Sequence, residues 1–541
     1  MNRSAEPAHA TSRHLSPPES APQSRLPHGA FNGTGAACGT VEQGGSRDIA
    51  STPIERNGAV ALLRFWLPGA LLLGTIAVRR WNQQGAFPTG VDGGQWLALG
   101  RGLFGDGRST DGAYAPFVPL LVEAGQAVFG PMVALKLVSL GSLVAVTSLV
   151  YLIAQRRLSI LLSVLVTATI GLASATAEPT AFGGYPQLIA FAFLLGASLC
   201  VARYLEAGQR CDLLGTALGL AGAAFSHHIY FPLAAAIVTL ISLIWLTTRP
   251  AWPTARTRGF GVSLALGVGV LCFVPTLLAF RSAGYAPPLD ASQFGVVEAF
   301  RYGTRESPLA WMSIVAGGVV GLVATARDRR QPLWQIAAAM IGLMLPLFLV
   351  AAEVRLLLPA LTAGTLGLAY GWQWLMETVT GPIRRVAQIA PLLLLLLWPG
   401  ADRAAGDYYR FYRVVDRSLI DTAATLDRQT DAGLAVVRHD RRGWPIGWWF
   451  EGLTGKRVAV GADLRWLGFP SERRQATLTA SFFDKPIAAE QLAVQAARHD
   501  VRWLIFRKWE WIGWQRWVET PNPPVTVVYD DDEFMILAIR E

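Results

Sequence analysis

The sequence predicts a polytopic α-helical membrane protein with about eleven transmembrane helices and a C-terminal extracytoplasmic α/β domain. Three observations predict this fold class. Of the 541 residues, 52% are hydrophobic and only 16% are charged. Apolar runs of roughly 20 residues, the length that crosses a bilayer core, recur between residues 57 and 401. From about Asp402 onward, the composition becomes that of a soluble domain.

Residues 1–56 differ from the rest of the chain. They are rich in Ser, Pro, Gly, Ala, His and Arg and contain few large apolar side chains. Such a segment cannot bury enough surface to offset its ordering entropy, so we expect a disordered cytosolic tail. The apolar run that begins near Gly58 has full span length and no convincing cleavage site, which argues against a secretory signal.

Residues 57–401 form the expected transmembrane domain. The candidate spans are 58–78, 131–154, 158–177, 186–205, 213–227, 229–248, 259–280, 308–326, 332–351, 355–376 and 386–400. The runs 213–227 and 386–400 are short for a hydrocarbon core, so they are the weakest members of this series.

Arginines near the span ends predict the orientation, because cytoplasmic loops carry the excess of basic residues. With the N-terminus in the cytoplasm, pairs such as Arg156–Arg157 and Arg384–Arg385 lie inside, and most loop carboxylates lie outside. An odd number of spans then places residues 402–541 outside as well. We therefore expect a multi-pass plasma membrane protein whose C-terminal domain is extracytoplasmic.

The first outer loop, 79–130, is too polar at its start to cross the membrane. Within it, 91–104 has the apolar spacing of a short amphipathic helix, and 114–129 is a second candidate that carries Pro116 and Pro119. We expect two helices that lie at the membrane interface.

Alternating strand and helix patterns in 402–541 predict a small layered α/β domain. The expected strands are 433–438, 457–462, 501–507, 524–529 and 534–540, and the expected helices are 410–429, 470–482 and 488–499. The tryptophans of this domain suit core packing first, then a membrane interface and last sugar contacts, so they do not identify an activity.

Charge and cysteine patterns exclude two classes of site. The net charge of +9 comes from arginines scattered between apolar runs, which argues against a nucleic acid partner. Cys38, Cys200, Cys211 and Cys272 show neither zinc-ligand spacing nor a disulfide framework.

The sequence FPTGVDGGQWLALGRGL places Asp92 among Gly90, Gly93 and Gly94 in the first outer loop. Glycines permit tight backbone geometry, so this carboxylate is a candidate for presentation at the mouth of a cavity. The alternative is an aspartate that caps the following helix.

This arrangement resembles the GT-C superfamily of membrane glycosyltransferases. The resemblance rests on the long first outer loop with an acidic residue ahead of two interfacial helices, on Tyr114, Pro116 and Pro119, on the many later spans and on the C-terminal outer domain. Protein mannosyltransferases, lipid A aminoarabinose transferases and oligosaccharyltransferase catalytic subunits belong to this superfamily. The resemblance implies a polyprenyl-phosphate-linked sugar donor, contact with membrane lipid, and a glycan, lipid or protein acceptor.

The resemblance also implies roles for two carboxylates. Asp92 matches the first-loop residue that acts as a catalytic base or is associated with a metal, although many relatives have two adjacent acidic residues where this chain has Asp92 and Gly93. Glu178, in the second outer loop, matches a position that joins the first carboxylate in some relatives. A solvated loop carboxylate is the alternative for Glu178. The involvement of a divalent metal stays open.

The substrate-binding candidates are Arg355, His227, His228, Glu353 and Tyr185. Arg355, followed by Pro359, is similar to the arginine that holds the lipid phosphate in the superfamily, while a Glu353–Arg355 pair is the alternative. His227 and His228 suit phosphate or metal binding, or merely an interfacial turn. Tyr185 stands in the same short loop region as Glu178.

The function expected on these grounds is sugar transfer at the outer face of a bacterial or archaeal membrane. The alternative is a membrane transporter or lipid flippase without covalent chemistry. Transporters commonly show repeated halves around polar groups at the membrane midplane, and the sequence shows no internal repeat of this kind.

Overall fold

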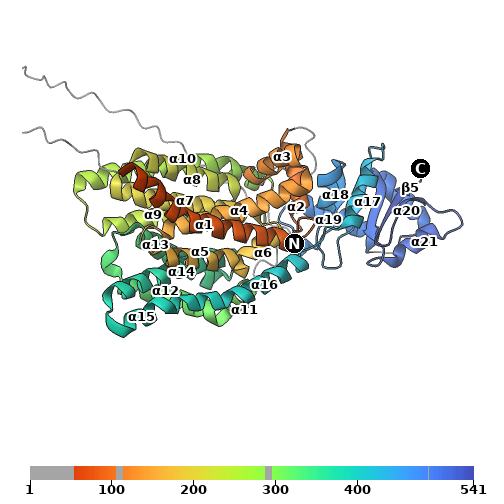
Figure 1. Cartoon of the computed structure of the whole chain (residues 1–541). Helices are drawn as coiled ribbons and strands as arrows, with labels where there is room; N and C mark the ends of the chain where they lie inside the picture. Colours follow the sequence, from red (N-terminus) through yellow and green to blue (C-terminus); the bar gives the residue numbers. More distant parts are fainter. Residues whose placement is uncertain (1–53, 105–113, 287–294, 485–486, 541) are drawn as a thin grey trace, which may run out of the picture. The chain divides into compact units, whose positions relative to one another are not determined.

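The computed structural model describes residues 54–104, 114–286, 295–484 and 487–540. The chain divides into two units, Met1–Asn57 and Gly58–Glu541. Most of the expected cytosolic tail, 1–56, lies outside the described residues, and the description below concerns the second unit (Figure 1).

Helices dominate the first three quarters of the second unit. They are α1 (Ile54–Gln84), α2 (Gly93–Phe104), α3 (Phe117–Phe129), α4 (Pro131–Ala154), α5 (Ile160–Leu172), α6 (Ser174–Phe182), α7 (Tyr185–Ala207), α8 (Arg210–Ser226), α9 (Tyr230–Leu246), α10 (Trp252–Ser282), α11 (Val296–Gly303), α12 (Pro308–Ala324), η1 (Ala326–Asp328), α13 (Pro332–Ala351), α14 (Val354–Thr378), α15 (Gly381–Ile389), η2 (Ala390–Leu397) and α16 (Trp398–Phe411).

Length and composition make this an integral membrane protein. Among the described residues, six helical segments are long and apolar enough to cross a membrane, or eight if the bent pairs α5–α6 and α11–α12 each count as one span. A helix stands at every place where the sequence predicts a span. The expected number of about eleven is not confirmed, because helices such as α8 and α9 have only 17 residues each.

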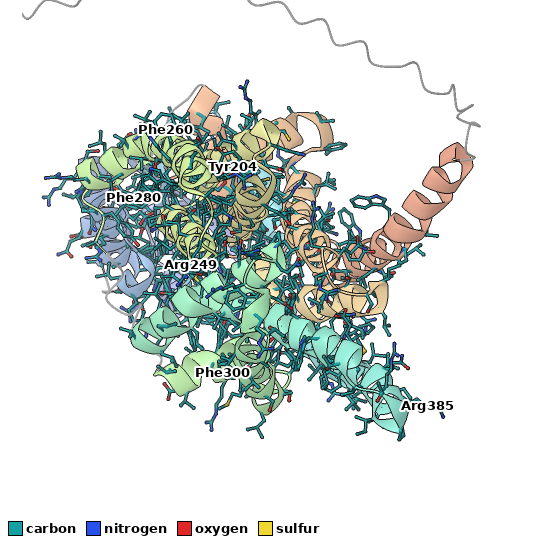
Figure 2. The ribbon with its side chains drawn as sticks, turned by 90° about the vertical axis from the view of Figure 1, so that its left-hand side faces the viewer. Tyr204, Arg249, Phe260, Phe280, Phe300 and Arg385 are labelled. Atoms are coloured by element: carbon teal, nitrogen blue, oxygen red, sulfur yellow. The ribbon has the colours of Figure 1, made fainter. Side chains whose placement is uncertain are left out.

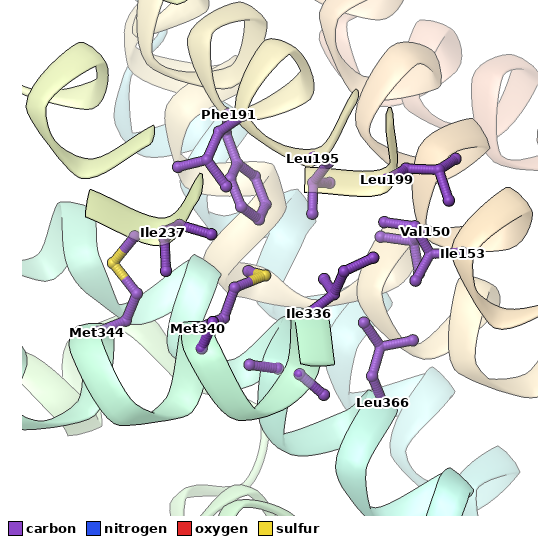
Figure 3. Close-up of a cluster of buried hydrophobic side chains, with 14 of the residues drawn as sticks. Val150, Ile153, Phe191, Leu195, Leu199, Ile237, Ile336, Met340, Met344 and Leu366 are labelled. Carbon is purple, nitrogen blue, oxygen red and sulfur yellow. The ribbon is translucent and has the colours of Figure 1, made fainter. Parts of the chain in front are cut away.

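A buried apolar core joins the long helices. Val150 of α4, Phe191 of α7, Ile237 of α9, Met340 of α13 and Leu366 of α14 all have no exposed surface and point toward one another (Figure 3). These residues come from five helices that are far apart in sequence. Their packing fixes the arrangement of the bundle.

Glycines bring α12 and α14 into direct backbone contact. A Cβ atom on Gly318 would collide with the carbonyl oxygen of Gly364, and one on Gly321 would lie 2.6 Å from the carbonyl oxygen of Gly367. Small residues at such crossings allow close van der Waals packing between membrane helices. This contact anchors α14, whose first turn carries Arg355.

Helix α10 has two different ends. Phe260, near its start, is 73% exposed, as expected for an apolar side chain that faces lipid, whereas Phe280, near its end, is 7% exposed (Figure 2). The Phe280 ring packs against Phe469 of the C-terminal region, with ring centroids 5.5 Å apart. The end of α10 therefore contributes to the contact between the bundle and the C-terminal region.

The C-terminal region is a mixed sheet with helices. Its elements are α17 (Arg417–Asp427), β1 (Leu434–Val437), α18 (Gly447–Thr454), β2 (Val458–Val460), η3 (Leu464–Trp466), α19 (Pro470–Phe483), α20 (Ala489–His499), β3 (Val501–Arg507), η4 (Ile512–Trp514), α21 (Gln515–Val518), β4 (Val525–Asp530) and β5 (Phe534–Ile539). The strand order is β2-β1-β3-β5-β4, with β1 parallel to β2 and β3, and β5 antiparallel to β3 and β4. The predicted domain boundary at 401/402 falls inside α16.

The two faces of this sheet pack against different partners. Val436, Leu504 and Phe506 pack with Phe482 and Leu492, which belong to α19 and α20. The opposite face belongs to a cluster that also contains α17, α18 and residues of α2 and α3 in the first loop. The sequence analysis predicts all five strands but does not predict α18, the helix that joins the sheet to the first loop.

Candidate active site

The loop that carries Asp92 is fixed by backbone hydrogen bonds to two distant parts of the chain. The amide of Asp92 donates to the carbonyl oxygen of Phe182 at 3.2 Å, and the amide of Gly90 donates to that of Tyr412 at 3.2 Å. Gly90 has φ +119°, and a Cβ there would lie 2.8 Å from the Phe182 carbonyl, so only glycine fits. This loop is therefore fixed to the ends of α6 and α16.

The carboxylate of Asp92 makes no hydrogen bond with the described residues, so the helix-capping bond expected as the alternative is not found among them. Burial raises the pKa of Asp92 to about 7, the positive charge of Arg355 opposes this rise, and the negative charge of Glu472 adds to it. A carboxylate that titrates near neutral pH is suited to accept a proton from a substrate.

Glu178 lies in α6 beside two tyrosines from distant segments. The hydroxyl groups of Tyr302 and Tyr412 donate to its Oε1 at 3.3 and 3.2 Å, and these two hydroxyls lie 2.6 Å apart. The solvated loop carboxylate that the sequence analysis gave as the alternative is therefore not found, because Glu178 accepts two hydrogen bonds from tyrosines. Since Tyr412 also receives the Gly90 hydrogen bond, the surroundings of Glu178 and Asp92 share one residue.

A buried arginine supports the bend that presents Glu178. Helices α5 and α6 meet at 41°, where the last carbonyl groups of α5 lack helical partners. Arg80 of α1, which has no exposed surface, donates to the carbonyl oxygens of Gly171 at 3.4 Å and Leu172 at 2.7 Å. Arg80 thus closes the end of α5 and holds the start of α6 in place.

Arg355 begins α14 directly after a tight turn. Ala352 adopts φ +51°, a conformation that non-glycine residues seldom take, and the Glu353 side chain accepts from the Arg355 amide at 3.3 Å. The two side chains form an ion pair with Nε and Oε1 3.7 Å apart. The pair that the sequence analysis gave as the alternative exists, yet the Arg355 side chain remains 43% exposed and able to contact a ligand.

The charge of Arg355 acts on several predicted site residues at once. It influences the protonation of Asp92 in the loop before α2, of Glu178 in α6, and of His227 and His228 in the turn between α8 and α9. Such long-range action falls off with distance, so these groups surround one region next to the first turn of α14. The fold brings together carboxylates and imidazoles around a single guanidinium group.

His227 and His228 stack face to face in the turn between α8 and α9, with ring centroids 4.8 Å apart. The amide of Ile229 donates to His227 Nδ1 at 3.2 Å. Burial and the charge of Arg355 lower the pKa of His228 to about 4, and burial lowers the pKa of His227 well below its usual range. Both imidazoles are therefore neutral at pH 7 and can offer a hydrogen bond but not a charge.

Glu472 of α19 is a site residue that the sequence analysis missed. It is 7% exposed, and its Oε1 accepts from Gln95 Nε2 at 3.3 Å and from the Tyr114 hydroxyl at 3.1 Å. Burial, followed by the negative charge of Glu472, raises the pKa of Tyr114 well above its usual range. The only sequence signal at this position is Pro470 ahead of a glutamate, which marks a helix start.

Aromatic rings surround this carboxylate. Tyr114, Phe280, Tyr285 and Phe469 form a cluster with centroid separations between 5.1 and 6.3 Å. The His228 ring joins it, 4.5 Å from Phe280. Segments of the first loop, α10 and the C-terminal region therefore meet in one aromatic wall beside the histidines.

Helix α18 forms another wall behind Asp92. The Trp449 indole nitrogen donates to the carbonyl oxygen of Gly90 at 3.1 Å. A Cβ on Gly94 would lie 2.5 Å from Trp449 Cα, so the glycine permits this close contact between α2 and α18. The glycines around Asp92 serve the packing of the C-terminal region onto the first loop.

Tyr185, expected among the substrate-binding residues, is completely buried. Its hydroxyl donates to the carbonyl oxygen of Thr89 at 3.3 Å, three residues before Asp92. This placement makes Tyr185 a support of the Asp92 loop.

The described residues do not fit a divalent metal. No group of three or more His, Cys, Asp or Glu side chains suited to hold a metal ion occurs among them. Asp92 and Glu178 each lie near Arg355, whose positive charge would repel a metal cation.

Comparisons with known proteins identify the fold. No model of a known protein family matches the chain, and no curated protein resembles it in sequence. Solved structures do match. The oligosaccharyltransferase of Archaeoglobus fulgidus, tethered to an acceptor peptide that contains the NVT sequon, has a TM-score of 0.52 at 12% identity, over 83% of this chain and 70% of that one.

Two further structures are similar. ArnT from Cupriavidus metallidurans, in the apo state, has a TM-score of 0.51 at 14% identity, over 87% of this chain and 97% of that one. The mycobacterial arabinofuranosyltransferase AftD has a TM-score of 0.57 at 16% identity, over 88% of this chain but only 41% of its own length. The structural neighbours are GT-C glycosyltransferases, so the predicted GT-C fold is confirmed.

Proposed function

We propose that this GT-C-fold protein is a membrane glycosyltransferase that moves a sugar from a polyprenyl-phosphate-linked donor to an acceptor hydroxyl at the outer face of a prokaryotic membrane. The observation that carries the proposal is the position of Asp92, whose pKa is about 7, in a fixed loop beside Arg355. A base that titrates near neutral pH and a cation suited to a phosphate are the two groups that this reaction needs.

In the proposed reaction, Asp92 accepts the proton of the acceptor hydroxyl while the acceptor oxygen forms a bond to the anomeric carbon. The bond between that carbon and the phosphate oxygen breaks, and the polyprenyl phosphate leaves with the electron pair. Arg355 stabilises the negative charge that grows on the departing phosphate. The 3.7 Å ion pair with Glu353 orients this guanidinium group.

The remaining predicted residues have supporting roles in this proposal. His227 and His228 stay neutral at pH 7, so they form hydrogen bonds with oxygens of the lipid-linked sugar without adding charge. Glu178 orients Tyr302 and Tyr412 through its two hydrogen bonds. Tyr185 holds the loop on which Asp92 stands.

The donor class is the best supported part of the substrate proposal. Lipid-linked sugar donors and their acceptors are the substrates of GT-C enzymes, and this chain shares their fold. The proposed acceptor is a glycan, a lipid or a protein that presents a hydroxyl group.

The test uses the purified full chain in lipid nanodiscs with polyprenyl-phosphate donors that carry radiolabelled arabinose, mannose or glucose. We expect label to pass from one donor to a glycan, lipid or protein acceptor, and the Asp92→Asn variant to lose at least about 100-fold of the rate. Asp427→Asn, an exposed change in α17, is the matched control. Full activity of Asp92→Asn contradicts the role of Asp92. Accumulation of a solute in proteoliposomes that contain the protein, without any covalent product, identifies a transporter instead.

A further inference from the structure

The C-terminal region contains a cavity that the proposed reaction does not use. Its volume is about 310 Å³, and residues from the end of α19, from η4 and from α21 line it. This volume corresponds to about ten waters of roughly 30 Å³ each, which is suitable for one sugar ring.

The walls of the cavity are largely aromatic. Phe483, Trp511 and Trp517 line it, and Trp511 lies 5.0 Å from Phe483 and 4.9 Å from Trp517 between ring centroids. Ile512, at the same cavity, is 73% exposed. Rigid aromatic walls of this kind pack against the C–H face of a sugar ring.

Three charged side chains also line the cavity: Asp484, Glu510 and Arg516. Arg516 and the Asp484 carboxylate make no ion pair or side-chain hydrogen bond within the described part of the chain. The amide of Arg441 lies near Glu510, but neither carboxylate oxygen of Glu510 forms a hydrogen bond of normal geometry with the described residues. Both oxygens are buried away from the cavity surface, whereas the side chains of Asp484 and Arg516 are exposed, so ligand hydroxyl groups can bond to these two.

The balance of charge selects the class of ligand. An anion would approach two carboxylates and one guanidinium group, and a cation would approach Arg516. A neutral molecule with both donor and acceptor hydroxyls and an apolar face fits the aromatic walls and the exposed side chains of Asp484 and Arg516. Sugars have these properties.

Helix α19 connects this cavity to the candidate active site. Glu472, near its start, bonds to Gln95 and Tyr114, whereas Phe483, at its end, lines the cavity. Eleven residues of α-helix separate the two positions by about 16 Å. A chain of a few sugars spans such a distance.

We propose that this cavity is a second sugar-binding site, which holds one ring of a glycan acceptor while the reactive end of the same glycan reaches Asp92. The binding of a sugar here stands on the cavity alone, and its assignment to the acceptor rests on the proposed function. An acceptor that occupies this cavity and also reaches Asp92 must be a glycan of several sugar units.

The test measures binding without any donor, so its result does not depend on sugar transfer. The full chain in lipid nanodiscs is titrated into fluorescently labelled arabinan, mannan and glucan hexasaccharides, and polarisation is followed. We expect at least one hexasaccharide to bind and both Arg516→Ala and Asp484→Asn to weaken that binding about fivefold or more. Arg474→Ala, an exposed arginine of α19 away from the cavity, is the matched control and keeps wild-type affinity.

Three outcomes would overturn the second site. They are absence of binding to every hexasaccharide, equal affinity in Arg516→Ala and wild type, and binding that Asp92→Asn removes while Arg516→Ala preserves it. Binding that depends on Arg516 in a protein that transfers no sugar would support the cavity site and count against the proposed function.

Discussion

The indole nitrogen of Trp449 donates a hydrogen bond to the carbonyl oxygen of Gly90 at 3.1 Å, two residues before Asp92. The C-terminal region therefore forms part of the environment of the proposed base. Trp449→Phe removes this donor, leaves a buried carbonyl unpaired and is expected to cost about 1–3 kcal/mol in the free energy of unfolding. Thermal unfolding measures the loss, and Trp374→Phe, a partly exposed tryptophan of α14, is the control. A Trp449→Phe protein as stable as the control would show that the bond contributes little.

The stability of the protein depends on pH through Asp92. Its pKa in the fold is about 7, well above the value of about 4 in an unfolded chain, so between these values the folded state binds the extra proton. Stability from this group is therefore fully present below pH 4 and is lost as the pH rises through 7. We expect Asp92→Asn to unfold at a higher temperature than wild type at pH 8, with the difference vanishing at pH 4. An Asn variant that is less stable at pH 8 would contradict this.

The activity has the matching dependence on pH. Because the base must be ionised, kcat/KM rises with pH through about 7 and then levels. Glu472→Gln removes a nearby negative charge while it keeps an oxygen that accepts from Tyr114, so the pKa of Asp92 falls and the rise moves to lower pH. The pH profiles of the two proteins test this. A shift to higher pH would show that Glu472 does not act on Asp92 through its charge.

Arg355→Ala is expected to lower kcat about 100-fold or more, because it removes the cation proposed for the departing phosphate. Arg355→Lys retains the charge but not the planar fork of donors. Its kcat is therefore expected to lie between that of the wild type and that of Arg355→Ala. Arg327→Ala, an exposed cation of η1, is the control. If all three variants keep the wild-type rate, Arg355 has no part in the reaction.

The turn before α14 offers a separate test of stability. Ala352 has φ +51°, which disfavours side chains with a branched Cβ. We expect Ala352→Val to cost about 1–2 kcal/mol in the free energy of unfolding, and Ala352→Gly to be within about 1 kcal/mol of wild type. Thermal unfolding of the two variants gives the comparison, and equal unfolding temperatures would contradict the strained turn.

Patterns that are local in sequence predicted much of this fold. Apolar runs placed the helices, and strands such as 501–507 lie where short apolar runs with β-branched and aromatic residues indicated. The same reasoning selected Asp92 and Arg355, because a charge in a glycine-rich loop or at a span end is locally conspicuous. The fold then surrounded Arg355 with the carboxylates and histidines that the sequence analysis had named.

What could not be predicted depends on contacts between distant segments. Glu472 resembles an ordinary residue of a helix start, and only the packing of α19 against the first loop brings it to Gln95 and Tyr114. Helix α18 is short and rich in tryptophan, so its sequence pattern favours neither a helix nor a strand. Tyr185 is completely buried because the loop that carries Thr89 and Asp92 covers it. The residues next to Tyr185 in sequence do not reveal this contact.

The hydrogen bond between Gln95 and Glu472 joins residues that are 377 positions apart. During synthesis, Asp92 leaves the ribosome long before Glu472 and Trp449 exist to enclose it. A partly translated chain therefore has the proposed base without its surroundings, and a polypeptide truncated before α18 lacks this enclosure permanently. Under the proposed function, the complete site therefore exists only once nearly the whole chain has been translated.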